Sequence, residues 1–258
     1  MADSGAALSG IEYLDMQAYV GITKHVGGME ATNELLARCH IGDAREVLNV
    51  GCGIGVTSAH IAKKHGCHVV GVDISEKMIE WSRRRARQER VESDVELRVA
   101  DILELPFQAG RFDVVIVESV IVFVEDKARA IRECVRVTKP GGYVGLSESC
   151  WIEKPSPALA ALARRYLGAE VPTAERWQAL WAASALNDRT VTIHHIDARK
   201  EVRDRLRWIG ARWALRALGR LLHLYLTKPA ARASIKAQFG AGSDSLEALA
   251  YGMLTGRK

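Results

Sequence analysis

Three glycines at alternate positions, Gly51, Gly53 and Gly55, directly follow four residues with strand character at 47–50. Because glycine has no Cβ, a loop of this kind lets a ligand lie against the backbone. A helical pattern follows the loop, and the start of a helix presents unpaired N–H groups to such a ligand. Asp73 ends the next apolar run, where a carboxylate can accept hydrogen bonds from two ribose hydroxyls. Together these residues predict a site for a cofactor that contains a nucleoside.

The spacing of the glycines argues against a dinucleotide. A dinucleotide-binding loop has the pattern G-x-G-x-x-G, in which the third glycine allows close packing of the helix. Here the pattern is G-x-G-x-G, so Val56 stands where that loop needs glycine. The loop also contains no arginine or lysine to face a pyrophosphate. Asp73 has an alternative interpretation, because it could simply cap the helix that begins near Ser75.

The elements that would position these residues follow from the hydrophobic pattern. Strands are predicted at 46–50, 68–73, 95–100, 112–117 and 143–147, and helices at 54–64, 75–88 and 126–138. The run Lys139-Pro140-Gly141-Gly142 should stop the last of these helices. Further along, strands are predicted at 190–195 and 251–255, and helical stretches at 156–186 and 198–227. Such alternation is typical of an α/β fold: a Rossmann-like, doubly wound, mostly parallel seven-stranded sheet with helices on both faces and a helical carboxyl-terminal insertion or cap.

The same alternation divides the chain into three parts. Residues 1–45 are expected to form a helical lid, residues 46–150 the Rossmann-like core, and residues 151–258 a helical cap with the last strands of the sheet. Open α/β sheets bind ligands at the carboxyl ends of their strands. Glu118 and Ser119 follow the strand at 112–117, so they are expected at the same edge as the glycine loop. The alternative for Glu118 is a solvated loop position.

Five segments in this order make the chain resemble the class I S-adenosylmethionine-dependent methyltransferases. They are 48–55, 72–75, 100–102, 112–115 and 139–142. The resemblance covers about residues 45–150, and it implies S-adenosyl-L-methionine as the cofactor and S-adenosyl-L-homocysteine as the product. It also implies a set of cofactor-binding residues, which are Tyr19, Asn49, Gly51, Cys52, Gly53, Gly55, Asp73, Ile74, Met78, Asp101, Ile102, Glu118 and Ser119.

The resemblance assigns individual roles within this set. The glycine loop would lie under the methionine part of the cofactor, and Asp73 would hold the ribose. Asp101 would receive the adenine amino group, and Ile102 would pack on the ring. Asn49 departs from the family, which usually has Asp or Glu there. Asn keeps an acceptor for the cofactor's ammonium group but lacks the negative charge, so a weaker affinity is expected. For Cys52, packing is a better interpretation than chemistry.

Methyl transfer from a sulfonium is an in-line displacement of an already activated methyl group. Positioning and the exclusion of water are therefore most of the protein's task. A base is needed only where the acceptor still carries its proton when it attacks. The candidates for catalytic roles are Tyr19, His25 and Glu118. His25 has an equally good interpretation as a structural loop histidine.

The run at residues 19–32 resembles the lid segment of phosphoethanolamine and sarcosine-type N-methyltransferases, which carry a similar Gly-Gly-x-Glu-Ala-Thr sequence. In the former, a lid tyrosine and a histidine after the fourth strand assist the reaction. Tyr19 matches the tyrosine, but residues 120–124 contain no histidine. This difference suggests an apolar pocket for a small-molecule acceptor, and it leaves oxygen, nitrogen and carbon open as the methylated atom.

The positive charge of the chain suggests further kinds of binding partner. The net charge is +5, and the stretch between residues 197 and 236 contains eleven Lys or Arg but only three Asp or Glu. The simplest interpretation is a helical cap with solvated arginines. A basic amphipathic helix near residues 203–226 could also touch a membrane surface or an anionic substrate. An RNA methyltransferase is the second hypothesis, although residues 117–120 lack the Asp/Asn-Pro-Pro-aromatic run of amino-directed enzymes, so nucleic acid is not expected as a partner.

A non-catalytic protein that binds S-adenosylmethionine is the third hypothesis, prompted by Asn49 and the missing histidine. The five cysteines have neither CxxC nor metal-ligand spacing, which predicts no metal site and reduced thiols in a cytoplasmic protein. No secretory signal is expected from the polar and small residues at the start. The apolar stretch at 114–124 is interrupted by Glu118 and is shorter than the ~20 residues of a membrane span. The sequence has no signal for an oligomeric state.

Overall fold

The structure is a computed structural model that describes residues 10–23, 26–167, 169–196, 209–228, 232 and 249–258. Its centre is a seven-stranded sheet with the order β3-β2-β1-β4-β5-β7-β6. The first five strands in this order are parallel, and β7 is antiparallel to both of its neighbours. The bounds are β1 Glu46–Val50, β2 His68–Asp73, β3 Val95–Val99, β4 Phe112–Glu118, β5 Thr138–Trp151, β6 Asn187–His195 and β7 Leu249–Arg257.

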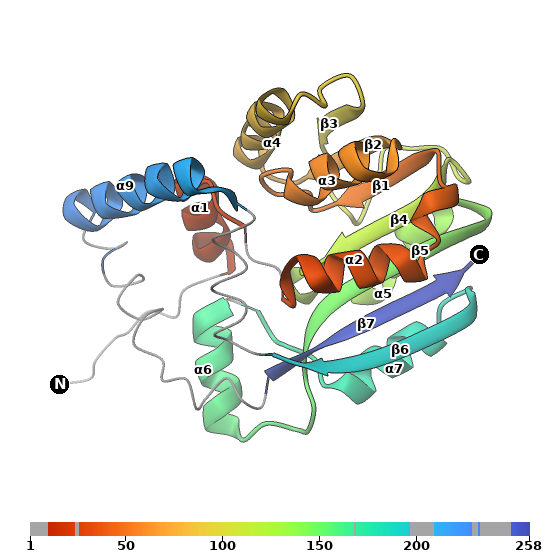
Figure 1. Ribbon diagram of the computed structural model, residues 1–258. Coiled ribbons are helices and arrows are strands. Elements are labelled where there is room, and N and C mark those ends of the chain that lie inside the picture. Colours follow the sequence, from red (N-terminus) through yellow and green to blue (C-terminus); the bar gives the residue numbers. More distant parts are fainter. Residues whose placement is uncertain (1–9, 24–25, 168, 197–208, 229–231, 233–248) are drawn as a thin grey trace.

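Helices cover both faces of this sheet, as Figure 1 shows. One face carries α2 (Gly28–Arg38), α3 (Val56–His65) and α4 (Glu76–Glu89). The opposite face carries α5 (Lys127–Val137) and α7 (Ala174–Ala182). The other described helices are α1 (Gly10–Val20), α6 (Pro157–Leu167), α9 (Ala211–Thr227) and two short 3-10 helices, η1 (Ile41–Asp43) and η2 (Ile121–Phe123). The predicted doubly wound, mostly parallel α/β fold is confirmed.

The central strands are apolar on both faces because each face meets a layer of helices. In β1, Leu48 and Val50 belong to the core under α5 and α7, whereas Val47 belongs to the core under α2 and α3. Two fully buried tryptophans lock α7 to the sheet. The indole Nε1 of Trp177 donates to the Ser149 carbonyl oxygen at 3.0 Å, and that of Trp181 donates to the Thr255 carbonyl oxygen at 3.1 Å. Each ring thus buries its apolar body and still satisfies its polar atom.

Most predicted elements are present, with ends shifted by a few residues at most, but one boundary was wrong. The fifth strand was predicted to begin at residue 143, after the run at 139–142. In the structure β5 begins at Thr138, so this run lies inside the strand. Its residues form an irregularity between the pairs Phe112–Thr138 and Val114–Tyr143. The stretch 156–186 contains two helices, α6 and α7. Of the stretch 198–227, residues 198–208 lie outside the described residues, and α9 accounts for Ala211–Thr227.

The amino-terminal helices have different positions. α2 packs on β5 and β7, and its Leu35 and Leu36 are fully buried there. α1 instead lies beside α9 at one end of the molecule, near α4 (Figure 1). None of the helices in the described ranges is long and apolar enough to cross a membrane. The division into lid, core and cap stays a prediction. Of the two α-helices described before β1, α2 packs on the sheet and α1 stands off it.

Candidate functional site

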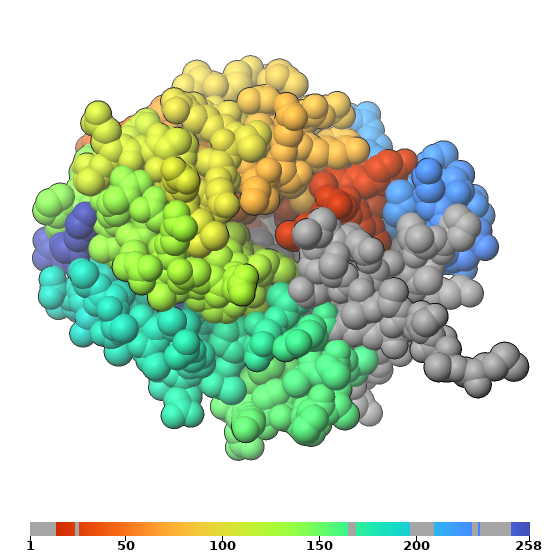
Figure 2. All heavy atoms as spheres, turned by 180° about the vertical axis from the view of Figure 1, so that it is seen from behind, coloured from red at the N-terminus to blue at the C-terminus, as the bar shows by residue number. Residues whose placement is uncertain are grey.

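A cavity of about 230 Å³ lies at the carboxyl ends of β1, β2 and β4. From behind, the surface is hollowed between the orange-to-green atoms of this edge and the red atoms of α1 (Figure 2). Eleven of the residues predicted for the site line the cavity: Asn49, Gly51, Cys52, Gly53, Asp73, Ile74, Met78, Asp101, Ile102, Glu118 and Ser119. Parallel strands bring these residues together because their carboxyl ends meet at one edge of the sheet.

The glycine loop turns tightly under the cavity. Gly51, Gly53 and Gly55 have φ angles of 68°, 54° and 81°, which favour glycine. A Cβ on Gly53 would lie 2.1 Å from Thr23 Cγ2, so this position must be bare for the amino-terminal segment to approach. Gly55 does not line the cavity. It is the N-cap of α3, and a Cβ there would lie 3.1 Å from the Cα of Ser82 in α4. Its role is the close packing of two helices.

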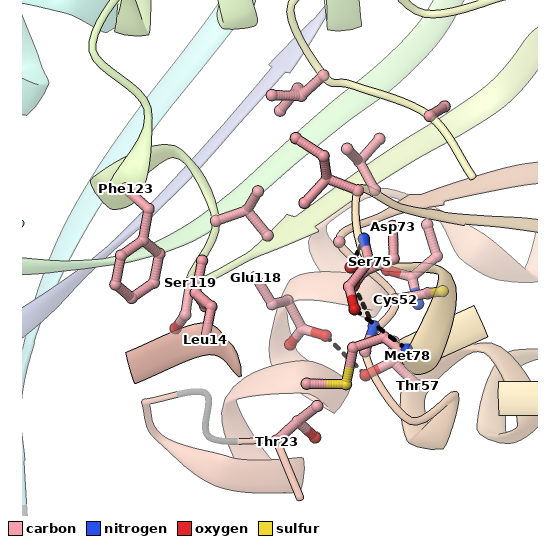
Figure 3. Close-up of a pocket in the computed structure, with 18 of the residues that line it drawn as sticks. Leu14, Thr23, Cys52, Thr57, Asp73, Ser75, Met78, Glu118, Ser119 and Phe123 are labelled. Atoms are coloured by element: carbon pink, nitrogen blue, oxygen red, sulfur yellow. Dashed lines mark hydrogen bonds between the residues drawn. The ribbon is translucent and has the colours of Figure 1, made fainter. Parts of the chain in front are cut away.

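Asp73 is held so that its carboxylate faces the cavity (Figure 3). Its Oδ2 accepts from the Gly53 backbone N–H and its Oδ1 from the Ser75 backbone N–H, both at 2.9 Å. Ser75 is the N-cap of α4, since its hydroxyl accepts from Met78 N at 3.4 Å. Ser75, and not Asp73, is therefore the N-cap residue of α4. Burial raises the pKa of Asp73, and the two N–H donors act against that rise.

The far end of the cavity presents apolar side chains beside a carboxylate. Ile74 is 66% exposed at the cavity wall although it is large and apolar. Ile102 and Met78 are buried nearby and line the same space. Asp101 uses one oxygen, Oδ1, to accept from Leu103 N at 2.8 Å. This combination suits a flat aromatic group that carries a hydrogen-bond donor.

Asn49 is buried at the floor of the cavity. Its Nδ2 donates to the hydroxyl of Ser58 at 2.9 Å, and this hydrogen bond fixes the orientation of the amide group. With the amide nitrogen used in this way, the amide oxygen is the atom left to accept from a ligand. Cys52 lines the cavity beside it, but burial and the charge of Asp73 raise the pKa of its thiol. The thiol therefore stays protonated, as expected for a packing residue.

Glu118 lies at the centre of the site, between Asp73 and Phe123 in Figure 3, and only 8% of it is exposed. Its Oε1 accepts from the Thr32 hydroxyl at 2.6 Å and its Oε2 from the Thr57 hydroxyl at 2.8 Å. Glu118 is thus not a solvated loop acid. It joins the end of β4 to helices on the same face of the sheet. The two threonines are functional candidates that the sequence did not single out, although Thr32 ends the run that resembles a lid segment.

The loop after β4 is held from below by a second buried carboxylate, Glu148. Its oxygens accept from three successive backbone N–H groups, those of Val120, Ile121 and Val122, at 2.9, 2.7 and 3.1 Å. Burial raises the pKa of Glu148 to about 7, and these donors and the charge of Lys127 act in the opposite direction. Glu148 was absent from the predicted site because the strand around it gives no sign that its side chain turns toward the loop.

The side of the cavity opposite Asp73 is mostly apolar. Its lining comes from α1 and from the loop that Glu148 holds, namely Leu14, Val120, Phe123 and Val124. Gln17 and Thr23 add polar atoms. Tyr19 is not part of the lining. Its ring packs against Lys77 instead, with the ammonium nitrogen 5.0 Å from the ring centre. His25 lies outside the described residues.

Residues 48–146 match the sequence pattern of a methyltransferase domain. The chain carries a methyltransferase domain. The match spans the glycine loop, Asp73, Asp101 and Glu118, and it confirms the resemblance drawn from the five segments.

A named relative supports the same assignment. Phosphoethanolamine N-methyltransferase 1 of Arabidopsis thaliana is 36% identical over 124 residues, which are 48% of this chain and 25% of the plant protein. The chain spans less than half the length of the curated relatives that it matches. The methyltransferase domain is therefore what these relatives share with it.

Solved structures resemble the whole described fold. The [4+2]-cyclase SpnF superposes with a TM-score of 0.74 at 20% identity, over 98% of this chain and 97% of its own. Phosphoethanolamine N-methyltransferase 2 of Haemonchus contortus, solved with phosphomonomethylethanolamine and S-adenosylhomocysteine, superposes with a TM-score of 0.69 at 17% identity, over 99% of this chain and 59% of its own. At these identities the likeness shows that the methyltransferase domain has its usual fold.

Proposed function

We propose that this chain binds S-adenosyl-L-methionine in the cavity and transfers its methyl group to a small, largely apolar molecule, with S-adenosyl-L-homocysteine as the product. The observation that carries the proposal is the carboxylate of Asp73. It ends β2, faces the cavity, and is fixed by backbone donors from the glycine loop and from the start of α4. A carboxylate in this position can accept hydrogen bonds from both hydroxyls of a ribose.

The remaining lining fits the other parts of the cofactor. Asp101 can accept from the adenine amino group, and Ile74 and Ile102 offer apolar surface to the ring. The glycine loop leaves room for the methionine part, and the amide oxygen of Asn49 can accept from its ammonium group. When bound, the cofactor supplies a methyl group activated by a positive sulfur. The residues around it then bind, orient and exclude water.

The acceptor would occupy the space between α1 and the loop after β4. Leu14, Val120 and Phe123 make that space apolar, which favours a small molecule with little charge. Glu118 is the carboxylate at its centre. Fixed by Thr32 and Thr57, it can receive a proton from an O–H or N–H acceptor, or orient a group without proton transfer. Roles for Tyr19 and His25 stay predictions, and Tyr19 would have to leave Lys77 to reach the cavity.

Calorimetry with S-adenosylmethionine and S-adenosylhomocysteine is the first test. The proposal is overturned if neither compound binds. The second is a methylation assay with labelled cofactor and extracts of metabolites and lipids. It must detect a methylated product, because a protein with this fold is named for a cyclase reaction. Labelled product in the small-molecule fraction supports the proposal. Cofactor binding without labelled product in any extract would favour the non-catalytic hypothesis.

A further inference from the structure

A second hollow lies between α4 and α9, and it shares no residue with the lining of the cavity just described. Its volume is about 320 Å³. Two tryptophans, three arginines and a glutamine line it: Trp81, Arg84, Gln88, Trp213, Arg216 and Arg220. We call it the arginine groove. Neither the methyltransferase match nor the proposed function assigns a role to it.

Two of the three arginines stack on the ring of Trp81. The guanidinium carbons of Arg84 and Arg220 lie 4.6 and 4.4 Å from the centre of the Trp81 ring. Arg220 is also anchored, because its Nε donates to the Val20 carbonyl oxygen at 2.7 Å. Trp81 is fixed by donation from its Nε1 to the Ala18 carbonyl oxygen at 2.9 Å. A guanidinium stacked on an aromatic ring keeps its N–H donors at its edge, where they can reach a ligand.

Among the described residues, the positive charges of the arginine groove are not paired with carboxylates. Arg84 and Arg220 stack on one ring, so their guanidinium groups are within about 9 Å of one another and repel. Arg216 adds a third positive charge one turn before Arg220. Burial lowers the pKa of Arg220, and the charges of Arg84 and Arg216 lower it further. Within the described ranges, no ion pair joins any of the three to a carboxylate.

This pattern differs from the arginines elsewhere in the described chain. Arg85, Arg111 and Arg136 are each paired with a glutamate. Three guanidinium groups that converge on a hollow without a counter-charge are what a site for an anion requires. Guanidinium groups match phosphate because two parallel N–H donors meet two oxygens.

We propose that the arginine groove binds a phosphoryl group, with Arg84, Arg216 and Arg220 as donors to its oxygens and Gln88 at the edge. Binding would replace the repulsion among the arginines by attraction. It would also join α4, α9 and the end of α1, because Trp81, Arg220 and Val20 belong to these three helices.

The phosphoryl group has two possible sources, a soluble phosphate compound or the headgroup of an anionic phospholipid. The second is suggested by a row of exposed leucines on α9. Leu215, Leu218, Leu222 and Leu226 are 69%, 61%, 56% and 63% exposed. They lie on the face of α9 opposite the buried Trp213, Ala217 and Leu224. An apolar row beside arginines is typical of helices that lie on anionic membranes.

The first experiment measures inorganic phosphate binding to the full chain by calorimetry, with sodium chloride of equal ionic strength as the reference. Saturable binding to the wild type is expected. The double variant Arg84→Gln/Arg216→Gln should weaken it at least tenfold. Arg87→Gln and Arg212→Gln remove the same charge from α4 and α9 outside the groove and should leave it unchanged. Circular dichroism and thermal unfolding verify that each variant folds.

The second experiment compares sedimentation with phosphatidylcholine vesicles that do or do not contain phosphatidic acid. If the phosphoryl group comes from a lipid, binding needs phosphatidic acid and is lost in Leu218→Ser/Leu222→Ser, while inorganic phosphate still binds that variant. If it comes from a soluble compound, phosphate binds and vesicles do not. The proposal is overturned if neither binds, if chloride has the same effect as phosphate, or if the arginine variants bind like the wild type.

Discussion

The roles of single residues in the cavity depend on their hydrogen-bond partners and on the atoms packed around them. Asp73 is a partly buried and Glu118 a buried carboxylate, and backbone N–H groups hold the first whereas threonine hydroxyls hold the second. Gly51 and Gly55 look alike in the sequence, yet only Gly51 lines the cavity. Gly55 instead allows α3 to approach α4. A residue's type and spacing therefore narrow its role, and its hydrogen bonds and neighbours decide it.

Asp73→Ala should weaken S-adenosylmethionine binding by about 1–3 kcal/mol, because charge-assisted hydrogen bonds to the ribose are lost. Calorimetry measures the change. Asp73→Asn keeps one acceptor and removes the charge, so an intermediate affinity is expected. Asp94→Asn, an exposed control, should bind like the wild type. An unchanged affinity in Asp73→Ala would remove Asp73 from the cofactor site.

Gly55→Ala should destabilise the fold more than Gly66→Ala. Both glycines flank α3 with positive φ angles, 81° and 66°, so alanine strains the backbone at each by about 1 kcal/mol. Only at Gly55 does the new Cβ meet a neighbour, the Cα of Ser82 at 3.1 Å, whereas nothing lies within 4 Å at Gly66. Urea unfolding should show an excess of roughly 1–3 kcal/mol for Gly55→Ala. Equal losses would contradict the packing role.

The elements that frame the cavity are held by contacts from outside it. The loop after β4 contains η2, a single short turn whose position depends on Glu148 of β5. α1 forms the opposite wall and depends on α9, because Trp213 Nε1 donates to the Gly21 carbonyl oxygen at 2.6 Å. Neither element is a regular part of the sheet. Each is held in place by hydrogen bonds with a side chain on a neighbouring element.

Glu148 should make the stability of the fold depend on pH. Its pKa is about 7 in the folded protein and 4.5 in a free side chain, so the folded protein keeps a proton that the unfolded chain releases. This contribution is fully present below about pH 4.5 and is lost as the pH rises through 7. From about pH 5 to about pH 8, the unfolding free energy of the wild type should fall relative to Glu148→Gln, by on the order of 3 kcal/mol. Urea unfolding curves at several pH values measure it, and parallel profiles of the two proteins would contradict the prediction.

On the scale of the whole molecule, α1 connects the two hollows. Leu14 and Gln17 line the cavity, and Val20 at the end of the same helix accepts from Arg220 of the arginine groove. A ligand in the groove would thereby brace one wall of the proposed active site. The net charge of +5 acts over the same scale, but as a diffuse attraction to any polyanion.

RNA should bind this protein only through that diffuse attraction. Gel shifts with tRNA are expected to show a weak complex at about 50 mM salt that disappears by about 200 mM. Labelled cofactor should transfer no methyl group to tRNA or rRNA. A complex that persists at the higher salt, or methylated RNA, would favour the RNA methyltransferase hypothesis over a small-molecule acceptor.

The sequence by itself determined the sheet, its parallel centre and one side of the proposed cofactor site. These features depend on local patterns: apolar runs form strands, glycine spacing shapes the loop, and polar residues at strand ends meet at one edge because the strands are parallel. Asp73, Asp101 and Glu118 could be found in this way. The end of α5 and the start of β5 were less certain, because residues 139–142 disrupt the pairing without ending the strand.

Only the tertiary structure decided what holds Glu118, which groups anchor the loop after β4, and where the arginines of α9 converge. Thr32 and Thr57 lie 86 and 61 residues from Glu118 in the chain, and Glu148 lies 28 residues from Val120. Val20 and Arg220 are 200 residues apart. No local pattern encodes such pairs, because each exists only when helices and strands that fold from distant segments pack and bring a donor to an acceptor.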